Sequence, residues 1–365
     1  MIESMKQVAI VGAGLVGRML VWRLLNEYPD LNIHLFDKDD LSQSTSAAQT
    51  AAGMISPLSE LCVSDRAIYD MGLAALTQWP NWLKKLEQQT GRKVDYQSCG
   101  SIVLAHALDQ NELTQFQQEI DFKLTQHDLN KQPYKWLDKT LLLEKESMIG
   151  QNFESGLFLN DEAYIDNREL LTSLKTFILN NHITVIDNCQ CDIVDNVVEF
   201  DDKKLKFDFV FDCRGIGSNV ENLRSVRGEV MHVECKEVNI KHAIRFMHPR
   251  YKLYIVPKPN HRYVIGATEI ESHDNSPMSL QSMMELGSAL YSVHPAFAES
   301  RVLEIDANLR PAMLDNNPVI KISNNVMCVN GLYRHGYLLI PEVINTVMNI
   351  LKKQSHQYHW MVSYE

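Results

Sequence analysis

Long hydrophobic runs are missing from this sequence. No apolar stretch approaches the ~18 residues that indicate a transmembrane helix. The N-terminal segment also lacks a signal-peptide pattern, because Lys6 is followed by a short apolar run and then by glycines. We therefore expect a cytoplasmic protein without a membrane span, although attachment to a membrane through a surface patch stays open.

Positive charge is scarce as well. The 365 residues include 35 Lys and Arg against 46 Asp and Glu, which leaves a formal net charge of −11. Nucleic-acid-binding proteins rely on a broad basic surface that neutralises phosphates. We therefore expect no nucleic-acid partner, whereas the net charge says nothing about a small anionic substrate, which local arginines would bind.

The seven cysteines are few, odd in number and scattered along the chain. No Cys or His cluster has the spacing of a zinc site, so we predict no bound metal. The pair Cys189 and Cys191 has strand spacing, which places both side chains on one face, most simply a buried one. We expect all seven cysteines to be reduced thiols.

The first 37 residues have the order of a nucleotide-binding unit. Residues 8–11 form a buried strand pattern, residues 15–27 have helical apolar spacing, and residues 32–36 form a second strand pattern. Between the first strand and the helix stands G-x-G-x-x-G, at Gly12, Gly14 and Gly17.

These glycines have separate physical roles. Gly12 makes the turn, Gly14 lets the backbone approach a pyrophosphate, and Gly17 allows close packing of helix and strand. Asp37 ends the second strand and can accept hydrogen bonds from ribose hydroxyls, which argues against NADP. The motif predicts a dinucleotide and by itself leaves NAD and FAD open.

The remaining chain alternates between two kinds of pattern. A helix is predicted over residues 64–89, interrupted near Pro80, and another over residues 341–353. Residues 229–268 are rich in strand patterns. The ends of the chain therefore read as α/β and the middle as an antiparallel sheet.

Several further segments stand in a recognisable order. They are Ala51-Ala52-Gly53-Met54-Ile55, Arg227-Gly228-Glu229, Tyr254-Ile255-Val256-Pro257, Val264 to Glu269, Leu309-Arg310-Pro311, Asn317-Pro318 and Gly331 to Leu339. Together with the glycine turn, this set resembles the D-amino-acid oxidase superfamily, and glycine oxidase most closely. The resemblance covers nearly the whole chain and is weakest over residues 64–147.

The resemblance implies an α/β fold in which a Rossmann-like FAD-binding domain is interleaved with a substrate domain built on a mostly antiparallel sheet. We assign residues 1–80, 148–220 and 306–365 to the FAD-binding domain. Residues 81–147 and 221–305 are assigned to the substrate-binding domain. The oligomeric state stays open, and a homo-oligomer is one alternative.

The resemblance also implies non-covalent FAD and gives the positions that contact it. They are Gly12, Gly14, Leu15, Val16, Gly17, Asp37, Lys38, Ala47, Ala48, Ala52, Gly53, Met54, Cys191, Gly215, Leu332, Tyr333, Arg334, His335, Gly336, Tyr337 and Leu338. The family usually has small residues around Arg214, and the roles of Arg214, Glu269 and His335 stay open.

The implied substrate residues are Arg310, Arg334 and Tyr254. A guanidinium offers two parallel donors to a carboxylate, which fixes an amino acid with its α-carbon toward the flavin. The expected reaction is the oxidative deamination of glycine, sarcosine or a small D-amino acid, with hydride transfer from the α-carbon to flavin N5. The electron acceptor is O2 or another compound.

Three alternatives remain open at this point. One is a flavin dehydrogenase with a different acceptor, and another is a tRNA-modifying flavoprotein, which the acidic composition disfavours. The last is a flavin-binding regulatory protein without turnover, which the presence of Arg310 and Arg334 disfavours.

Overall fold

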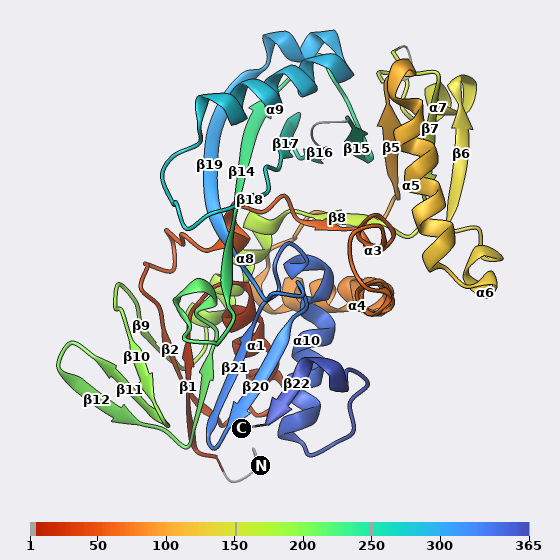
Figure 1. The fold of residues 1–365 in the computed structure, drawn as a ribbon. Helices are drawn as coiled ribbons and strands as arrows, with labels where there is room; N and C mark the ends of the chain where they lie inside the picture. Colours follow the sequence, from red (N-terminus) through yellow and green to blue (C-terminus); the bar gives the residue numbers. More distant parts are fainter. Residues whose placement is uncertain (1–4, 150–151, 249–251, 365) are drawn as a thin grey trace.

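The computed structural model describes residues 5–149, 152–248 and 252–364, and it contains two large β-sheets (Figure 1). The first sheet has seven strands in the order β22-β20-β21-β13-β1-β2-β9. The strands are β1 (Gln7–Val11), β2 (Asn32–Phe36), β9 (Ile183–Ile186), β13 (Phe209–Asp212), β20 (Val319–Ser323), β21 (Val326–Asn330) and β22 (Val362–Tyr364). All neighbouring pairs are parallel except β20 and β21.

Both faces of this sheet are covered. Four helices pack together on one face: α1 (Leu15–Glu27), α4 (Arg66–Thr90), α8 (Asn167–Leu179) and α10 (Gly336–Leu351). A three-stranded sheet of β10 (Asp192–Val194), β11 (Val197–Phe200) and β12 (Lys203–Lys206) packs its apolar residues on the other. Because parallel strands are usually buried on both sides, their near-continuous apolar sequences follow from this arrangement.

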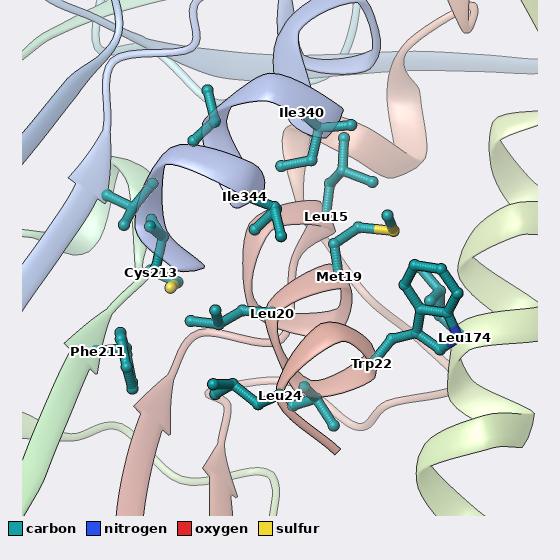
Figure 2. Close-up of a cluster of buried hydrophobic side chains, with 14 of the residues drawn as sticks. Leu15, Met19, Leu20, Trp22, Leu24, Leu174, Phe211, Cys213, Ile340 and Ile344 are labelled. Atoms are coloured by element: carbon teal, nitrogen blue, oxygen red, sulfur yellow. The ribbon is translucent and has the colours of Figure 1, made fainter. Parts of the chain in front are cut away.

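Helix α1 shows why the sequence folds in this way. Leu20, Trp22 and Leu24 are at most 1% exposed. Figure 2 shows that Leu20 lies toward Ile344 of α10 and that Trp22 lies beside Leu174 of α8. The apolar spacing therefore places α1 between the sheet and its neighbouring helices.

The second large sheet has nine strands and is mostly antiparallel. Its strands are β5 (Ser101–Ala105), β6 (Tyr134–Asp138), β7 (Ser155–Leu159), β14 (Arg224–Glu234), β15 (Ala243–Met247), β16 (Lys252–Lys258), β17 (Arg262–Gly266), β18 (Ile270–Glu271) and β19 (Arg301–Ala312). Only the pair β5 and β15 is parallel among its described pairings. Helix α9 (Leu280–Val293) packs against β14, β16 and β17.

Shorter elements complete the described chain. A small sheet of β3 (Met54–Ile55), β8 (Ala163–Ile165) and β4 (Tyr96–Gln97) lies between the two large sheets (Figure 1). The remaining helices are α2 (Ala47–Thr50), α3 (Pro57–Leu61), α5 (Gln110–Lys123), α6 (Gln126–Leu129) and α7 (Lys139–Lys145), with short 3-10 turns at Ala107–Asp109, Gly215–Gly217, Pro295–Glu299 and His359–Met361. Among the described helices, none is long and apolar enough to span a bilayer.

The predicted fold class is confirmed, because a parallel and a mostly antiparallel sheet are interleaved along the chain. The exact domain boundaries stay a prediction. Strand β7 falls within the segment 148–220 but joins the antiparallel sheet, and β19 crosses the boundary at residue 306.

Two prolines lie inside helices. The predicted interruption at Pro80 is wrong, because α4 continues through it. Helix α10 begins at Gly336, five residues before its predicted start, and contains Pro341. Proline has no N–H for the carbonyl four residues earlier, here that of Tyr337. The indole Nε1 of Trp79 donates to that carbonyl instead, at 3.1 Å.

Leu20 has no exposed surface, so truncating its side chain should lower the free energy of unfolding strongly. We expect Leu20→Ala to lower the free energy of unfolding by about 2–5 kcal/mol, because the vacated volume stays partly empty. The matched control is Leu108→Ala, since Leu108 is 97% exposed and its truncation should cost under about 0.5 kcal/mol. Urea unfolding followed by circular dichroism measures both; equal midpoints for the two variants would contradict this packing.

Candidate active site

A cavity of about 1220 Å³ lies between the two large sheets, with walls from both. Pockets for drug-sized ligands measure roughly 300–1,000 Å³, so this one suits a larger molecule. Every residue predicted from the sequence to bind cofactor or substrate lines the cavity, except Gly17. The fold therefore brings together segments as far apart in the sequence as Gly12 and Leu338.

The glycine turn explains that exception. A Cβ on Gly17 would lie 1.9 Å from the carbonyl oxygen of Gly12, and one on Gly12 would lie 2.4 Å from that of Cys213. These two glycines are required by the protein's own packing. A Cβ on Gly14 would meet only the Cβ of Ser46, at 3.5 Å. The protein's own packing therefore does not require glycine here, which agrees with a role in letting a ligand in the cavity approach the backbone.

Two helix N-termini open into the cavity. Gly14 precedes α1 and His335 precedes α10, and neither helix has a side-chain cap or an acidic residue in its first turn. The first backbone N–H groups of a helix have no partner within it. Uncapped N-termini therefore favour an anion in the cavity, as a pyrophosphate would supply.

Asp37 lines the same end of the cavity. Its carboxylate accepts hydrogen bonds from the backbone N–H groups of Ala13 and Asp39, the latter at 2.8 Å. Burial raises the pKa of Asp37, and these hydrogen bonds oppose the shift. Asp37 thus holds the glycine turn against the end of β2 while still facing the cavity.

The small-residue loop before β3 is fixed by donors from several elements. The hydroxyl of Tyr337 donates to the carbonyl of Ala48 at 2.9 Å. The ammonium of Lys258 donates to the carbonyls of Ala52 and Ile165, at 2.9 and 2.7 Å. Burial lowers the pKa of Lys258 to about 8. Sequence reasoning did not identify Lys258, although a lysine at the end of an apolar strand was a visible signal.

Arg214, whose role was open, has a clear structural task. Its guanidinium pairs with Asp212 at 2.8 Å and donates to the carbonyl oxygen of Cys191 at 2.9 Å. It therefore joins the end of β13 to the residue before β10, and Cys191 and Cys213 beside these contacts line the cavity. The sulfur atoms of Cys189 and Cys191 lie 3.9 Å apart.

The cysteine predictions can be compared directly with the structure. All seven cysteines are free thiols in the structure. Among the described residues there is no group of three His, Cys, Asp or Glu side chains placed to hold a metal ion.

Arg310 extends from β19 across β14. Its Nη1 donates to the carbonyls of Arg227 and Thr268, at 3.3 and 3.2 Å. A Cβ on Gly228 would lie 2.1 Å from Nη2 of Arg310, so only glycine fits beneath the guanidinium. Within the described ranges, Arg310 has no ion pair with a carboxylate.

Arg334 contrasts with Arg310, because two carboxylates contact it. Its Nε lies 2.7 Å from Glu60 and its Nη1 lies 2.8 Å from Glu269. Burial acts to lower the pKa of Arg334, but the two carboxylates outweigh it and raise that pKa. The resemblance implied that Arg334 binds the substrate, and in the structure it contacts two carboxylates of the protein.

Glu60 is the centre of a charged cluster. Arg245 lies 3.1 Å from it and the Nδ1 of His335 lies 3.3 Å from it, in addition to Arg334. Burial acts to raise the pKa of Glu60, but these neighbours hold it well below its usual range. Sequence reasoning missed Glu60 and Arg245; an arginine within the apolar strand β15 was the available signal.

Tyr254 completes this end of the cavity. It pairs across β16 and β15 with Arg245, and its hydroxyl would lie 3.1 Å from a Cβ on Gly266. Burial raises the pKa of Tyr254, so the hydroxyl stays protonated at neutral pH and can donate a hydrogen bond. The arrangement can bind an anion and orient it, with backbone donors at one end and guanidinium groups at the other.

Comparisons with known proteins agree with the resemblance to the D-amino-acid oxidase superfamily. The sequence model of the family "FAD dependent oxidoreductase" (DAO) matches residues 7–343. The chain is 31% identical over 353 residues to the "Putative thiamine biosynthesis oxidoreductase ThiO" of Rhizobium etli, covering 96% of this chain and 98% of that protein. It is 23% identical to the "Bifunctional protein ThiO/ThiG" of Trichormus variabilis, covering 96% of this chain and 53% of that protein.

A solved structure shares the fold. The crystal structure of glycine oxidase from Geobacillus kaustophilus matches with a TM-score of 0.83 over 98% of both chains, at 19% sequence identity.

The cluster around Glu60 predicts a pH-dependent contribution to stability. Because the folded-state pKa is lowered, the stabilisation is complete above the unfolded value of about 4.3 and declines as pH falls below it. We expect Glu60→Gln to cost about 3 kcal/mol at neutral pH, since it leaves buried cations unpaired. The difference from wild type should shrink in acid.

Urea unfolding at neutral pH and below pH ~4 measures this difference. The control is Glu144→Gln, because Glu144 is exposed and should change the unfolding midpoint little at either pH. A Glu60→Gln deficit that stays constant with pH would show that the carboxylate is not held ionised by its neighbours.

Proposed function

The chain belongs to the DAO family of FAD-dependent oxidoreductases, and from that membership we propose that it catalyses the oxidative deamination of a small amino acid. The substrates that fit are glycine, sarcosine or a small D-amino acid. Support comes from the position of Arg310, a guanidinium on the cavity wall that has no carboxylate partner among the described residues. A protein with the same fold is named glycine oxidase.

FAD is the cofactor of this family, and the residues around the cavity fit it. The volume exceeds that of drug-sized pockets, and the uncapped N-terminus of α1 faces inward beside the open side of Gly14. We propose that the cavity-lining residues of the first turn, Asp37, the loop before β3 and the segment 332–338 hold it without a covalent bond. When bound, FAD supplies the acceptor for the hydride of the substrate.

Side chains of the protein orient the substrate. Arg310 presents its guanidinium above Gly228, positioned by hydrogen bonds to the carbonyls of Arg227 and Thr268, and two parallel N–H donors match a carboxylate. The hydroxyl of Tyr254, protonated at neutral pH, adds a further donor. Holding the carboxylate at these groups fixes where the α C–H points, and such positioning lowers the barrier without a side-chain base.

Arg334 contributes less to binding the substrate carboxylate than the sequence suggested. Because Glu60 and Glu269 already contact its Nε and Nη1, fewer of its donors remain for substrate. We propose that Arg334 contributes to the shape and potential of the pocket, while Arg310 anchors the carboxylate.

Anaerobic reduction of the bound flavin tests the function. The purified protein should be yellow, and glycine, sarcosine or D-alanine should bleach its absorbance near 450 nm, a region where oxidised flavins absorb. A yellow protein that none of a panel of small amino acids and secondary amines reduces would remove the claim. With O2 as the acceptor, peroxide appears during turnover; a dehydrogenase would release none.

Arg310→Ala should raise KM for the preferred amino acid about 100-fold or more, because the charged hydrogen bonds to the carboxylate are lost. FAD should stay bound, since its contacts are elsewhere. Arg301→Ala is the matched control, an exposed arginine on the same strand, and should leave KM unchanged. An unchanged KM for Arg310→Ala would show that the carboxylate binds elsewhere.

Gly14→Val should weaken FAD binding about 100-fold while the apoprotein keeps its melting temperature, because the new Cβ would meet the Cβ of Ser46 at an ordinary contact distance of 3.5 Å and no backbone atom. Gly17→Ala should lower the melting temperature of the apoprotein, because its Cβ meets the carbonyl of Gly12. FAD titration and thermal unfolding of the apoproteins separate the two effects. Equal FAD affinity in Gly14→Val and wild type would refute this placement of the cofactor.

A further inference from the structure

Glu269 is a carboxylate in the wall of a pocket built for anions. It follows β17, lines the cavity, and its side chain is 52% exposed. Burial acts to raise its pKa, but Tyr333, Arg334 and Arg310 together lower it, so Glu269 carries a negative charge at neutral pH. Glu60, in contrast, lies deeper and is enclosed by cations.

The charges at this end of the cavity nearly balance. Among the residues that the structure describes, three guanidinium groups line the cavity around Glu269, those of Arg245, Arg310 and Arg334, together with the two carboxylates of Glu60 and Glu269; Glu285 lines the cavity as well. Leaving the histidines and Glu285 aside, these five groups sum to one positive charge. One substrate carboxylate neutralises this charge, and a second carboxylate would give the group a net negative charge, which is unfavourable beside the carboxylate of Glu269.

Geometry leads to the same result. Besides Arg310, the described guanidinium groups here are those of Arg334 and Arg245, but Nη1 of Arg334 already lies 2.8 Å from Glu269 and Arg245 lies 3.1 Å from Glu60. A substrate with a second carboxylate would therefore either displace Glu269 or lie beside it. Both arrangements are unfavourable, because one breaks a charged hydrogen bond and the other places like charges together.

We propose that Glu269 is the residue that restricts this site to amino acids with a single carboxylate, by occupying Arg334. This inference rests on the proposed function, and it names the substrate class more narrowly: glycine, sarcosine and D-alanine are accepted, whereas iminodiacetate and D-aspartate are rejected. Glu269→Gln keeps the size and an acceptor oxygen of the side chain while removing its charge, so the formal sum becomes two positive charges.

The first test compares sarcosine with iminodiacetate, which is sarcosine carrying a second carboxylate. In the FAD-loaded wild-type protein, kcat/KM for iminodiacetate should be at least about 100-fold below that for sarcosine. In Glu269→Gln this ratio should shift toward iminodiacetate by about 30-fold or more. The ratio is the readout, because a displacement of Arg334 would affect both substrates.

Glu271→Gln is the matched control. Glu271 is two residues further on, is exposed, and pairs with Arg224 outside the cavity lining. Its substitution should leave the ratio at the wild-type value. A wild-type protein that oxidises iminodiacetate as well as sarcosine, or a Glu269→Gln ratio equal to wild type, would overturn the proposal.

A binding measurement separates this proposal from the proposed function. Methoxyacetate and diglycolate are the ether analogues of sarcosine and iminodiacetate, and they bind without reacting. Calorimetry on the FAD-loaded protein should show diglycolate gaining at least about tenfold in affinity relative to methoxyacetate in Glu269→Gln. If no amine reduces the flavin but this gain appears, the amine oxidation fails and the role of Glu269 stands. If amines are oxidised and the gain is absent, Glu269 does not set the limit.

Discussion

The proposed substrate site depends on a difference in charge pairing among the arginines of the cavity wall. Glu60 and Glu269 hold Arg334, and Glu60 also contacts Arg245. Among the described residues, Arg310 instead donates hydrogen bonds to backbone carbonyl oxygens and forms no ion pair with a carboxylate. A guanidinium that is partly buried without a counter-ion favours the binding of an anion. Gly228 leaves room for the guanidinium of Arg310, and the carbonyls of Arg227 and Thr268 accept hydrogen bonds from its Nη1.

The cofactor end of the cavity is preformed in the same sense. Tyr337 and Lys258 donate to carbonyls of the loop before β3, and Arg214 joins the strands on the opposite side. None of these contacts needs a ligand. The free energy of cofactor binding therefore does not have to offset an entropy cost of ordering these loops. The two uncapped helix N-termini then supply donors whose only remaining partners are solvent or an anion.

Much of this arrangement could be predicted from local sequence patterns. The glycine turn and Asp37 have fixed spacings because one β-α-β unit contains them all, and the resemblance supplied the distant loops. The cluster of Glu60, Arg245 and Arg334 could not be predicted, because three elements far apart in the sequence meet only in the fold.

The helices show a similar limit. A proline usually ends a helix, and this rule misplaced the start of α10 and divided α4. In α10 the indole of Trp79, which lies in α4, takes the carbonyl that Pro341 leaves without a donor. Such compensation comes from a neighbouring helix and leaves no local signal in the sequence.

The most direct test of the account is a crystal structure of the FAD-loaded protein with methoxyacetate bound. The account predicts that the carboxylate forms paired hydrogen bonds with the guanidinium of Arg310, while Arg334 keeps its contacts with Glu60 and Glu269. A carboxylate bound to Arg334 in place of Glu269, or bound away from both arginines, would contradict it.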